Sequence, residues 1–249
     1  MNYHIEQRTW EYILKFLRGI KGLHTKEESK LRRFVEGIWY IMRSGCQWRL
    51  LPEDYGNWRA IHRRFKQWSD KGIWEQLMTY VVDADKENLL MDATIVRAHA
   101  CAAGYVKSSQ DAQALGRSKG GLSTKIHALV DALGLPLKFI VTPGQRNDIT
   151  QAQSLIKGEK NSTIIADKGY DSDELIEAIK KQGCMAVVPS RIKRKKPRQY
   201  DRHLYKERHL IECFFSKIKH FRRVFSRFDK TASVFLSFLS FVGALIWLR

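Results

Sequence analysis

The stretch between positions 205 and 219 combines four side chains whose chemistry suits contact with phosphate or metal ions. Offsets of three, four and seven place them on one face of a helix: Tyr205, Arg208, Glu212 and Lys219. The flank of that helix is apolar enough to pack on a core. A carboxylate between an arginine and a lysine also fits two ordinary ion pairs on a helix surface. The stretch alone therefore leaves both a structural and a chemical role open.

Two aspartates far upstream favour the chemical role. Asp92 and Asp167 each follow apolar residues in a short run that is typical of a buried strand. Each carboxylate should emerge at the edge of a sheet, where it is costly unless paired, hydrogen-bonded or bound to metal. If the two strands are neighbours, their acids converge, and Glu212 on the long helix can complete the cluster.

Three carboxylates suit a hard divalent cation such as Mg²⁺, and Mn²⁺ is expected to substitute for it. Two such ions, about 3.5–4 Å apart, can activate an attacking oxygen and stabilise the leaving oxygen of a phosphodiester. Positive charge from Lys168, Arg208 and Lys219 would hold DNA phosphates beside the metals.

The overall charge points to a polyanionic partner. The 249 residues include 44 Lys and Arg against 26 Asp and Glu, a formal net charge of +18. A balance this one-sided indicates nucleic acid or an anionic membrane. The four cysteines form no CxxC pair, which argues against a zinc site and a disulfide framework. With no signal-peptide pattern at the N-terminus, we expect a cytoplasmic, nucleoid-associated protein.

A charge-free segment from Thr231 to Leu248 is at the threshold length for a membrane span. Small residues recur along one stripe of it, which fits close packing against another helix, in a core or in a membrane. We favour a buried C-terminal helix and no membrane contact, because the preceding helix carries chemistry that has to meet a polyanion.

Residues 1–85 predict a small all-α N-terminal domain. Helical periodicity covers residues 30–43, 57–68 and 73–81, with Asn57 as an N-cap of the second helix. That helix exposes three arginines: Arg59, Arg63 and Arg64. Two helices joined by a short Gly-containing turn fit a DNA-binding helix-turn-helix-like unit. They fit equally an ordinary bundle with a solvated basic face.

Residues 86–249 predict an α/β domain with a mixed sheet flanked by helices. Apolar runs indicate strands over 88–96, 123–131, 135–142, 162–167 and 184–188. Helices are expected over 148–157 and from 171 to 179. Asp171 and Glu174 have the spacing of a capping box. His127 and Lys125 alternate on a strand, which indicates a solvated face. A basic loop over 190–203 precedes the C-terminal helices.

Four segments at matching order and spacing resemble bacterial insertion-sequence transposases of the DDE class, close to the IS-five group. The segments are Met91–His99, Gly120–Asp131, Ala166–Ser172 and Tyr205–Lys219. The last follows the family signature Tyr-x2-Arg-x3-Glu-x6-Lys at every position, and the similarity spans essentially the whole chain. The resemblance implies a ribonuclease-H-like fold. It assigns Asp92, Asp167 and Glu212 as catalytic Mg²⁺ ligands, and Tyr205, Arg208 and Lys219 as DNA contacts.

By this resemblance, the protein binds the terminal inverted repeats of an insertion sequence, cuts a strand at each end and exposes a 3′-hydroxyl. That hydroxyl then attacks target DNA, and joining two ends makes a homodimer the expected assembly. Two alternatives stay open: a non-catalytic DNA-binding regulator, which does not need the acid trio, and a Mg²⁺-dependent nuclease that cannot join DNA.

Overall fold

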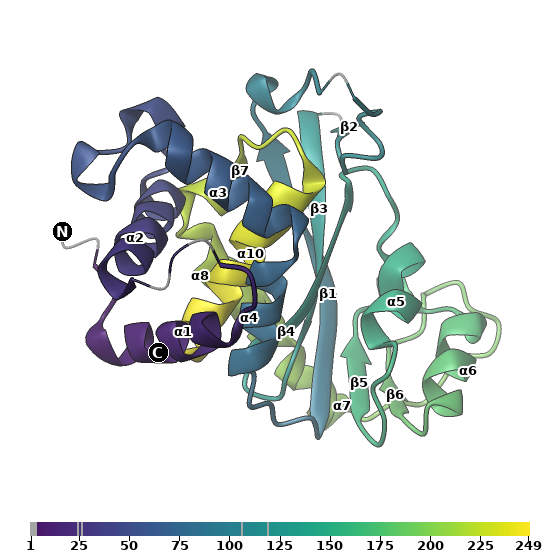
Figure 1. The fold of residues 1–249 in the computed structure, drawn as a ribbon. Helices are drawn as coiled ribbons and strands as arrows, with labels where there is room; N and C mark the ends of the chain where they lie inside the picture. Colours follow the sequence, from purple (N-terminus) through teal and green to yellow (C-terminus); the bar gives the residue numbers. More distant parts are fainter. Residues whose placement is uncertain (1–3, 24, 26, 106, 119) are drawn as a thin grey trace.

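The computed structural model describes residues 4–249 except 24, 26, 106 and 119. A mixed β-sheet separates two layers of helices (Figure 1). The strands are β1 (Asn88–Ala98), β2 (Gly116–Ser118), β3 (Gly121–Val130), β4 (Pro136–Pro143), β5 (Thr163–Ala166), β6 (Met185–Val187) and β7 (Ser226–Arg227). All five strands expected from the apolar runs are present.

β1 lies at the centre of the sheet. It pairs antiparallel with β3 on one side and parallel with β5 on the other, and β7 extends the β5 side near the end of β1. β3 pairs antiparallel with β2 and β4, and β5 pairs parallel with β6. The sheet thus joins antiparallel strands to a parallel pair, the mixed α/β architecture that the resemblance implies.

The N-terminal region is helical, as expected, with α1 (Gln7–Gly19), α2 (Glu28–Ser44), α3 (Trp58–Asp70) and α4 (Ile73–Val81). Gly45 ends α2 in a left-handed conformation with φ 66°, which glycine adopts without strain. Asn57 caps α3, because its side chain accepts hydrogen bonds from the backbone N–H groups of Arg59 and Ala60. The predicted cap is therefore confirmed.

These four helices share one hydrophobic core with the C-terminal helices and one face of the sheet. α10 (Ala232–Trp247) packs against α3, α4 and β4, and aromatic rings join the two ends of the chain. The ring centroids of Phe65 and Phe238 are 4.5 Å apart, and those of Trp74 and Phe241 are 4.8 Å apart. The C-terminal helix is buried, as expected. A functional division between residues 1–85 and 86–249 stays a prediction.

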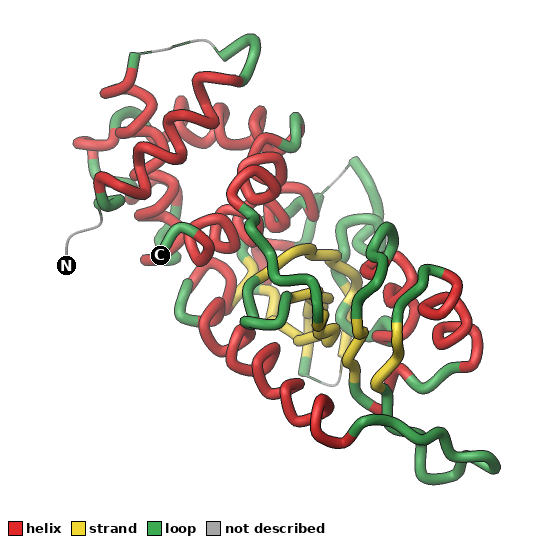
Figure 2. Tube along the Cα trace, turned by 90° about the horizontal axis from the view of Figure 1, so that it is seen from below, coloured by secondary structure: helices red, strands yellow, loops and turns green. Residues whose placement is uncertain are grey.

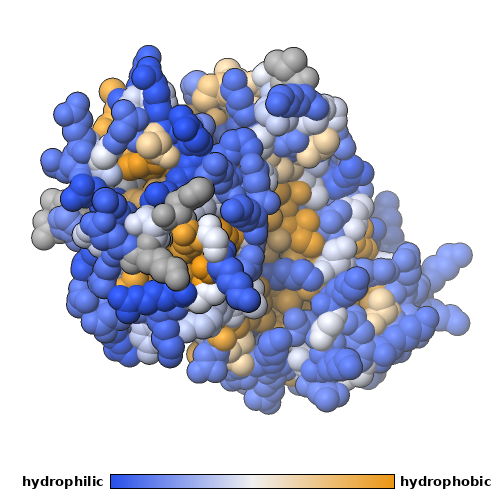
Figure 3. Space-filling view, viewed as in Figure 1, coloured by the Kyte–Doolittle hydropathy of each residue, from blue (hydrophilic) through white to orange (hydrophobic). Residues whose placement is uncertain are grey.

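Across the described ranges of the chain, no helix has both the length and the hydrophobicity that a membrane span requires. Figure 3 shows hydrophilic residues over most of one face of the molecule.

The opposite face of the sheet carries a second, smaller core. It lies under a short 3₁₀ helix (Asp148–Gln151), α5 (Ala152–Ile156) and α6 (Asp173–Lys181). His127 on β3 faces this layer and is fully buried, and the Lys125 side chain is only 11% exposed. The predicted solvated face is wrong, because β3 is an inner strand whose second face is covered by α5.

The helix expected around Glu212 is built from three consecutive parts. α7 (Arg202–Tyr205) continues through a 3₁₀ turn (Lys206–Arg208) into α8 (His209–Lys219), and Figure 2 shows one helical rod whose end joins a projecting loop. The apolar flank of α8 is buried: Ile211, Phe214, Phe215 and Ile218. A four-residue helix, α9 (Arg222–Phe225), then leads into β7. The basic loop spans residues 188–201, because α7 begins at Arg202.

Candidate active site

Asp92 and Asp167 lie side by side on two neighbouring strands. β1 and β5 run parallel with Met91 opposite Ala166, so each aspartate is the next residue along its strand. Leu90 and Ile165, two positions earlier, belong to the core on the α8 side of the sheet. Because side chains alternate along a strand, both aspartates point to that same side. The expectation that their strands are neighbours is confirmed. The expected position at a sheet edge holds for Asp167, which directly follows β5, but is wrong for Asp92, because β1 is a central strand that continues in register with β3 beyond it.

The backbone that follows each aspartate orients its carboxylate. Asp92 Oδ1 accepts a hydrogen bond from the Ala93 N–H, with an N–O distance of 2.7 Å. Asp167 Oδ1 accepts one from the Gly169 N–H at 2.8 Å, in the 3₁₀ turn Lys168–Tyr170. Each local turn therefore holds one carboxylate oxygen in place.

Arg208 connects the first aspartate to the glutamate. Its Nη1 donates to Asp92 Oδ2 at 3.1 Å, and its Nη2 donates to Glu212 Oε1 one helical turn further on. The predicted common helix face of Arg208 and Glu212 is thus confirmed. Glu212 and Asp92 are thus bridged by a single guanidinium group. The Glu212 side chain is 56% exposed.

Burial raises the pKa of Asp92 to about 6. The negative charges of Asp167 and Asp148 act in the same direction, whereas the Ala93 N–H and the Arg208 guanidinium oppose them. The half-buried carboxylates of Asp92 and Asp167 repel each other, so a nearby cation would stabilise both in their charged forms. In the structure, Arg208 supplies part of that positive charge.

The donor chemistry of this place fits a divalent metal ion. Asp92, Asp167 and Glu212 offer only carboxylate oxygens, which Mg²⁺ and Mn²⁺ prefer. Among the residues that the structure describes, no three His, Cys, Asp or Glu side chains are grouped so that they could hold a metal ion. Arg208 pairs with two of the three carboxylates, so a metal site built from all three would require Glu212 to give up its ion pair with Arg208.

The predicted DNA-contacting residues of this region differ in exposure and in their place on the elements. Lys168 directly follows Asp167 and is exposed. Tyr205 is half-buried, its ring centroid 5.5 Å from that of Tyr200, and burial raises its pKa. Lys219 is half-exposed at the end of α8, two helical turns beyond Glu212.

The arginines of α3 are not equivalent. Arg59 is exposed, with its guanidinium 5.2 Å from the ring centroid of Trp58, and Arg63 is exposed as well. Arg64 is half-buried, 5.1 Å from the ring of Phe34, and burial lowers its pKa. The expectation that Arg64 is exposed is wrong, because its position turns toward α2.

Two residues near the acids were not singled out from the sequence. Asp148 Oδ1 accepts a hydrogen bond from Lys125 Nζ at 2.5 Å, and the negative charge of Asp148 raises the pKa of Asp92. The hydroxyl of Tyr170 is buried without a hydrogen-bond partner in the described part of the chain. Burial raises the pKa of Tyr170, and the charges of Asp92, Asp148 and Asp167 add to this. The signal for Tyr170 was its place in the segment Ala166–Ser172.

The predicted capping box at the start of α6 is wrong. Ser172 is the N-cap, and no side chain caps the helix. The Asp171 side chain is 1% exposed and turns instead to the basic loop, where it pairs with Arg194 and Arg198. Sequence spacing could not distinguish these outcomes, because the partners of Asp171 lie more than twenty positions away.

Two family models cover most of the chain. Residues 5–78 match the model of candidate transposases of the IS4/5 family (DUF4096). Residues 83–247 match the model described as transposase DDE domain.

Known proteins with similar sequences include insertion-sequence transposases. A candidate transposase of element IS6501 from Brucella ovis is 44% identical over 133 residues, covering 51% of this chain and all of that protein. A candidate transposase of element IS402 from Burkholderia cepacia is 30% identical over 135 residues, covering 49% of this chain and 62% of the relative.

Among solved structures, the chain is similar to piggyBac transposase in a synaptic complex with hairpin DNA. Sequence identity is 13% and the TM-score 0.39, over 78% of this chain and 48% of that one. A likeness at this level adds nothing to what the family models establish. Together with the mixed sheet and its flanking helices, those models show that this chain belongs to the DDE-domain transposases of insertion sequences, which have a ribonuclease-H-like fold.

Proposed function

We propose that this transposase binds the terminal inverted repeats of its element and catalyses strand cleavage and strand transfer in a Mg²⁺-dependent reaction. One observation carries the proposal: Asp92 and Asp167 lie next to each other on parallel strands, and Arg208 links Glu212 to the same place. An arrangement of repelling carboxylates beside exposed cations suits phosphodiester chemistry with divalent metal.

The three carboxylates have the role of metal ligands. When bound, two Mg²⁺ ions would supply positive charge at the attacking and leaving oxygens of the phosphodiester, and Mn²⁺ would substitute. Cleavage forms a bond from a water oxygen to phosphorus and breaks the bond to the 3′ oxygen, which leaves as a hydroxyl. Transfer repeats the displacement: that 3′ oxygen bonds to a target phosphorus, the bond from this phosphorus to the target strand's 3′ oxygen breaks, and the latter leaves as a hydroxyl with the proton of the attacking group. One site can therefore serve both steps.

Residues beside the acids hold the DNA. The Arg208 guanidinium can exchange its carboxylate partners for phosphate oxygens, to which it donates a pair of parallel hydrogen bonds. Lys168 is exposed next to Asp167 and attracts the same phosphodiester. Tyr205 offers a hydroxyl donor, and Lys219 extends the basic surface along α8.

Recognition of the element ends is assigned to the N-terminal helices. Arg59 and Arg63 are exposed on α3, which is joined to α4 by the short turn Lys71-Gly72. Joining two ends to one target requires two active sites, which favours a homodimer on DNA. A location on the nucleoid, in the cytoplasm, follows from these partners.

An assay with three outcomes tests the proposal. Purified protein is incubated with labelled element-end duplex, target duplex and Mg²⁺, and the products are separated on a denaturing gel. We expect both a cleaved strand and a joined product, with neither formed by Asp92→Asn. Binding without cleavage would identify a regulator, and cleavage without joining would identify a nuclease. Either result in the wild-type protein would overturn the proposed function.

A further inference from the structure

The basic loop, residues 188–201, projects from the molecule between β6 and α7 (Figure 2). Val188 and Tyr200 tie its two ends to the hydrophobic cores, but Ile192 between them is 92% exposed, so burial of apolar side chains cannot hold the middle of the loop in one conformation. Apart from Arg191, whose exposed side chain donates to backbone carbonyls, its cations fall into two groups. Two arginines are half-buried against α6, and three lysines are exposed.

Asp171 anchors the half-buried group. Its Oδ2 accepts from the Arg191 N–H at 2.9 Å, and its Oδ1 accepts from Arg194 Nη1 at 3.0 Å and from Arg198 Nη1. Asp173 accepts from the second nitrogen of both arginines. Charge-assisted hydrogen bonds from two guanidinium groups to a carboxylate with 1% exposure are strong and directional. They fix the base of the loop on the start of α6.

A second set of contacts fixes the loop beside the active site. Arg191 Nη2 donates to the Gly169 carbonyl at 2.9 Å, and its Nε donates to the Lys168 carbonyl at 3.4 Å. The Gly169 N–H in turn holds Asp167 Oδ1 at 2.8 Å. The loop is therefore tied to the same turn that orients one of the catalytic carboxylates.

The exposed group consists of Lys193, Lys195 and Lys196. Within the described residues these three lysines form no ion pair. Three like charges on a short, anchored loop repel one another and add nothing to the stability of the fold. A polyanion laid across the loop would remove that repulsion and release its own counterions.

We propose that the basic loop is a phosphate clamp, held beside Asp167 by Asp171, in which Lys193, Lys195 and Lys196 bind the backbone of duplex DNA next to the cleaved phosphodiester. The clamp reads no bases, because solvated lysines at the tip of a loop act as point charges. Asp171 is a positioning residue in this arrangement. The inference deepens the proposed function and rests on it.

The first test neutralises the clamp without disturbing its base. The triple variant Lys193→Ala, Lys195→Ala, Lys196→Ala is compared with a control that loses three exposed lysines elsewhere: Lys157→Ala, Lys160→Ala and Lys181→Ala. Binding of element-end duplex is measured at several salt concentrations. The plot of log K against log salt has a negative slope. We expect this slope to become shallower by about three in the clamp variant and to change little in the control. Equal slopes in the two variants would overturn the clamp.

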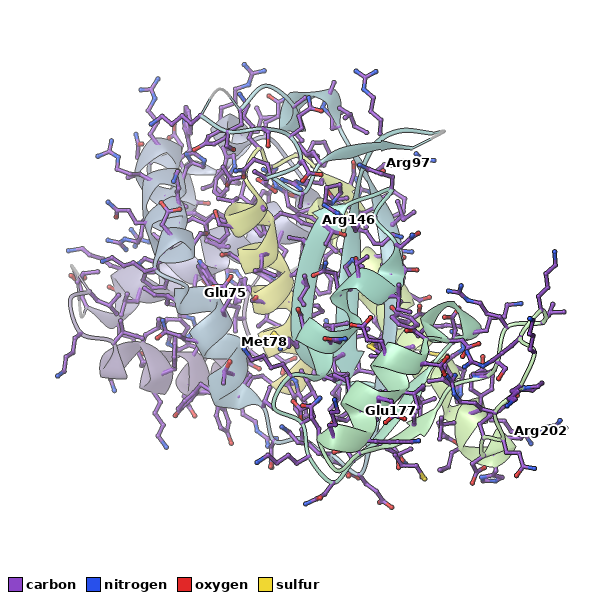
Figure 4. All side chains as sticks on the ribbon, turned by 90° about the vertical axis from the view of Figure 1, so that its right-hand side faces the viewer. Glu75, Met78, Arg97, Arg146, Glu177 and Arg202 are labelled. Atoms are coloured by element: carbon purple, nitrogen blue, oxygen red, sulfur yellow. The ribbon has the colours of Figure 1, made fainter. Side chains whose placement is uncertain are left out.

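The second test uses the sign of a charge change. Asp171→Asn makes the protein more positive, so charge counting alone predicts tighter DNA binding. Release of the loop predicts the opposite, a loss of about tenfold if the docked loop falls to one-tenth of the population. Glu177→Gln is the matched control, because it removes the same negative charge. Glu177 lies on α6, away from the loop that leads to Arg202 (Figure 4). Binding by Asp171→Asn as tight as by Glu177→Gln would contradict the positioning role.

Failure of this inference differs from failure of the proposed function. If wild-type protein does not bind or cleave element ends, the proposed function is wrong whatever the variants do. If wild-type protein cleaves and joins DNA while the clamp and control variants behave alike, only the clamp is wrong. Circular dichroism of each variant separates loss of binding from loss of folding.

Discussion

Arg208 Nη1 lies 3.1 Å from Asp92 Oδ2, although 116 positions separate the two residues along the chain. This ion pair joins the helical rod to the central strand at the place where Asp167 also emerges. Arg208 shares its single positive charge between Asp92 and Glu212, so it offsets part of the repulsion that Asp92 experiences from Asp167. The same contact makes Arg208 a competitor of the metal ion for these oxygens.

Removal of this competitor should separate metal binding from catalysis. We expect Arg208→Ala to bind Mn²⁺ more tightly than wild type, on the order of tenfold, which corresponds to about 1.4 kcal/mol. DNA cleavage should fall, because the variant has lost a donor to phosphate. Calorimetric titration with Mn²⁺ and the gel assay measure the two effects. A parallel loss of metal affinity and cleavage would mean that Arg208 only orders the acids.

The acid trio should be required for chemistry and dispensable for DNA binding. Asp92→Asn, Asp167→Asn and Glu212→Gln keep the shape of each side chain and remove its charge. We expect each to lower cleavage by about a thousandfold or more, while binding of element-end duplex stays within a few-fold of wild type. Near-normal turnover in any of the three would contradict its assignment as a metal ligand.

The proximity of Asp92 and Asp167 could be predicted because their signal is local. An acid after a short apolar run indicates a buried strand, and period-two alternation fixes the side to which it points, although Asp92 lies within β1 and only Asp167 follows the end of its strand. Asp171 could not be predicted, because a capping box and a buried anchor for distant arginines have the same local spacing. For His127, alternation along the strand could not show that α5 covers the second face of the sheet.

His127 should make the fold sensitive to acid. Burial lowers its pKa from 6.5 to about 4, and its Nε2 lies 2.8 Å from Thr142 Oγ1. The folded state therefore favours the neutral ring. Stability from this group is complete above pH 6.5 and is lost as the pH falls toward 4, by up to about 3 kcal/mol.

Denaturant unfolding at pH 7 and pH 4.5 measures this loss in wild type and in His127→Gln. We expect the variant to lose less stability between the two pH values. Asp92 contributes with the opposite sign, because its raised pKa favours the folded state as the pH falls, but it is present in both proteins and cancels. Equal losses would show that the ring titrates alike in the folded and unfolded chains.

End recognition by α3 should appear in the salt dependence of binding. Arg59→Ala with Arg63→Ala removes two exposed cations, so the negative slope of log K against log salt should become shallower by about two. Arg64→Ala is the control, because the Arg64 side chain packs on Phe34 and its loss should lower stability through packing rather than change the slope. If the double variant keeps the wild-type slope while the clamp variant loses it, recognition of the ends belongs to the basic loop, and the N-terminal helices are a bundle with a solvated face. That outcome would not change the catalytic role proposed for the acid trio, because DNA binding and DNA cleavage are measured in separate assays.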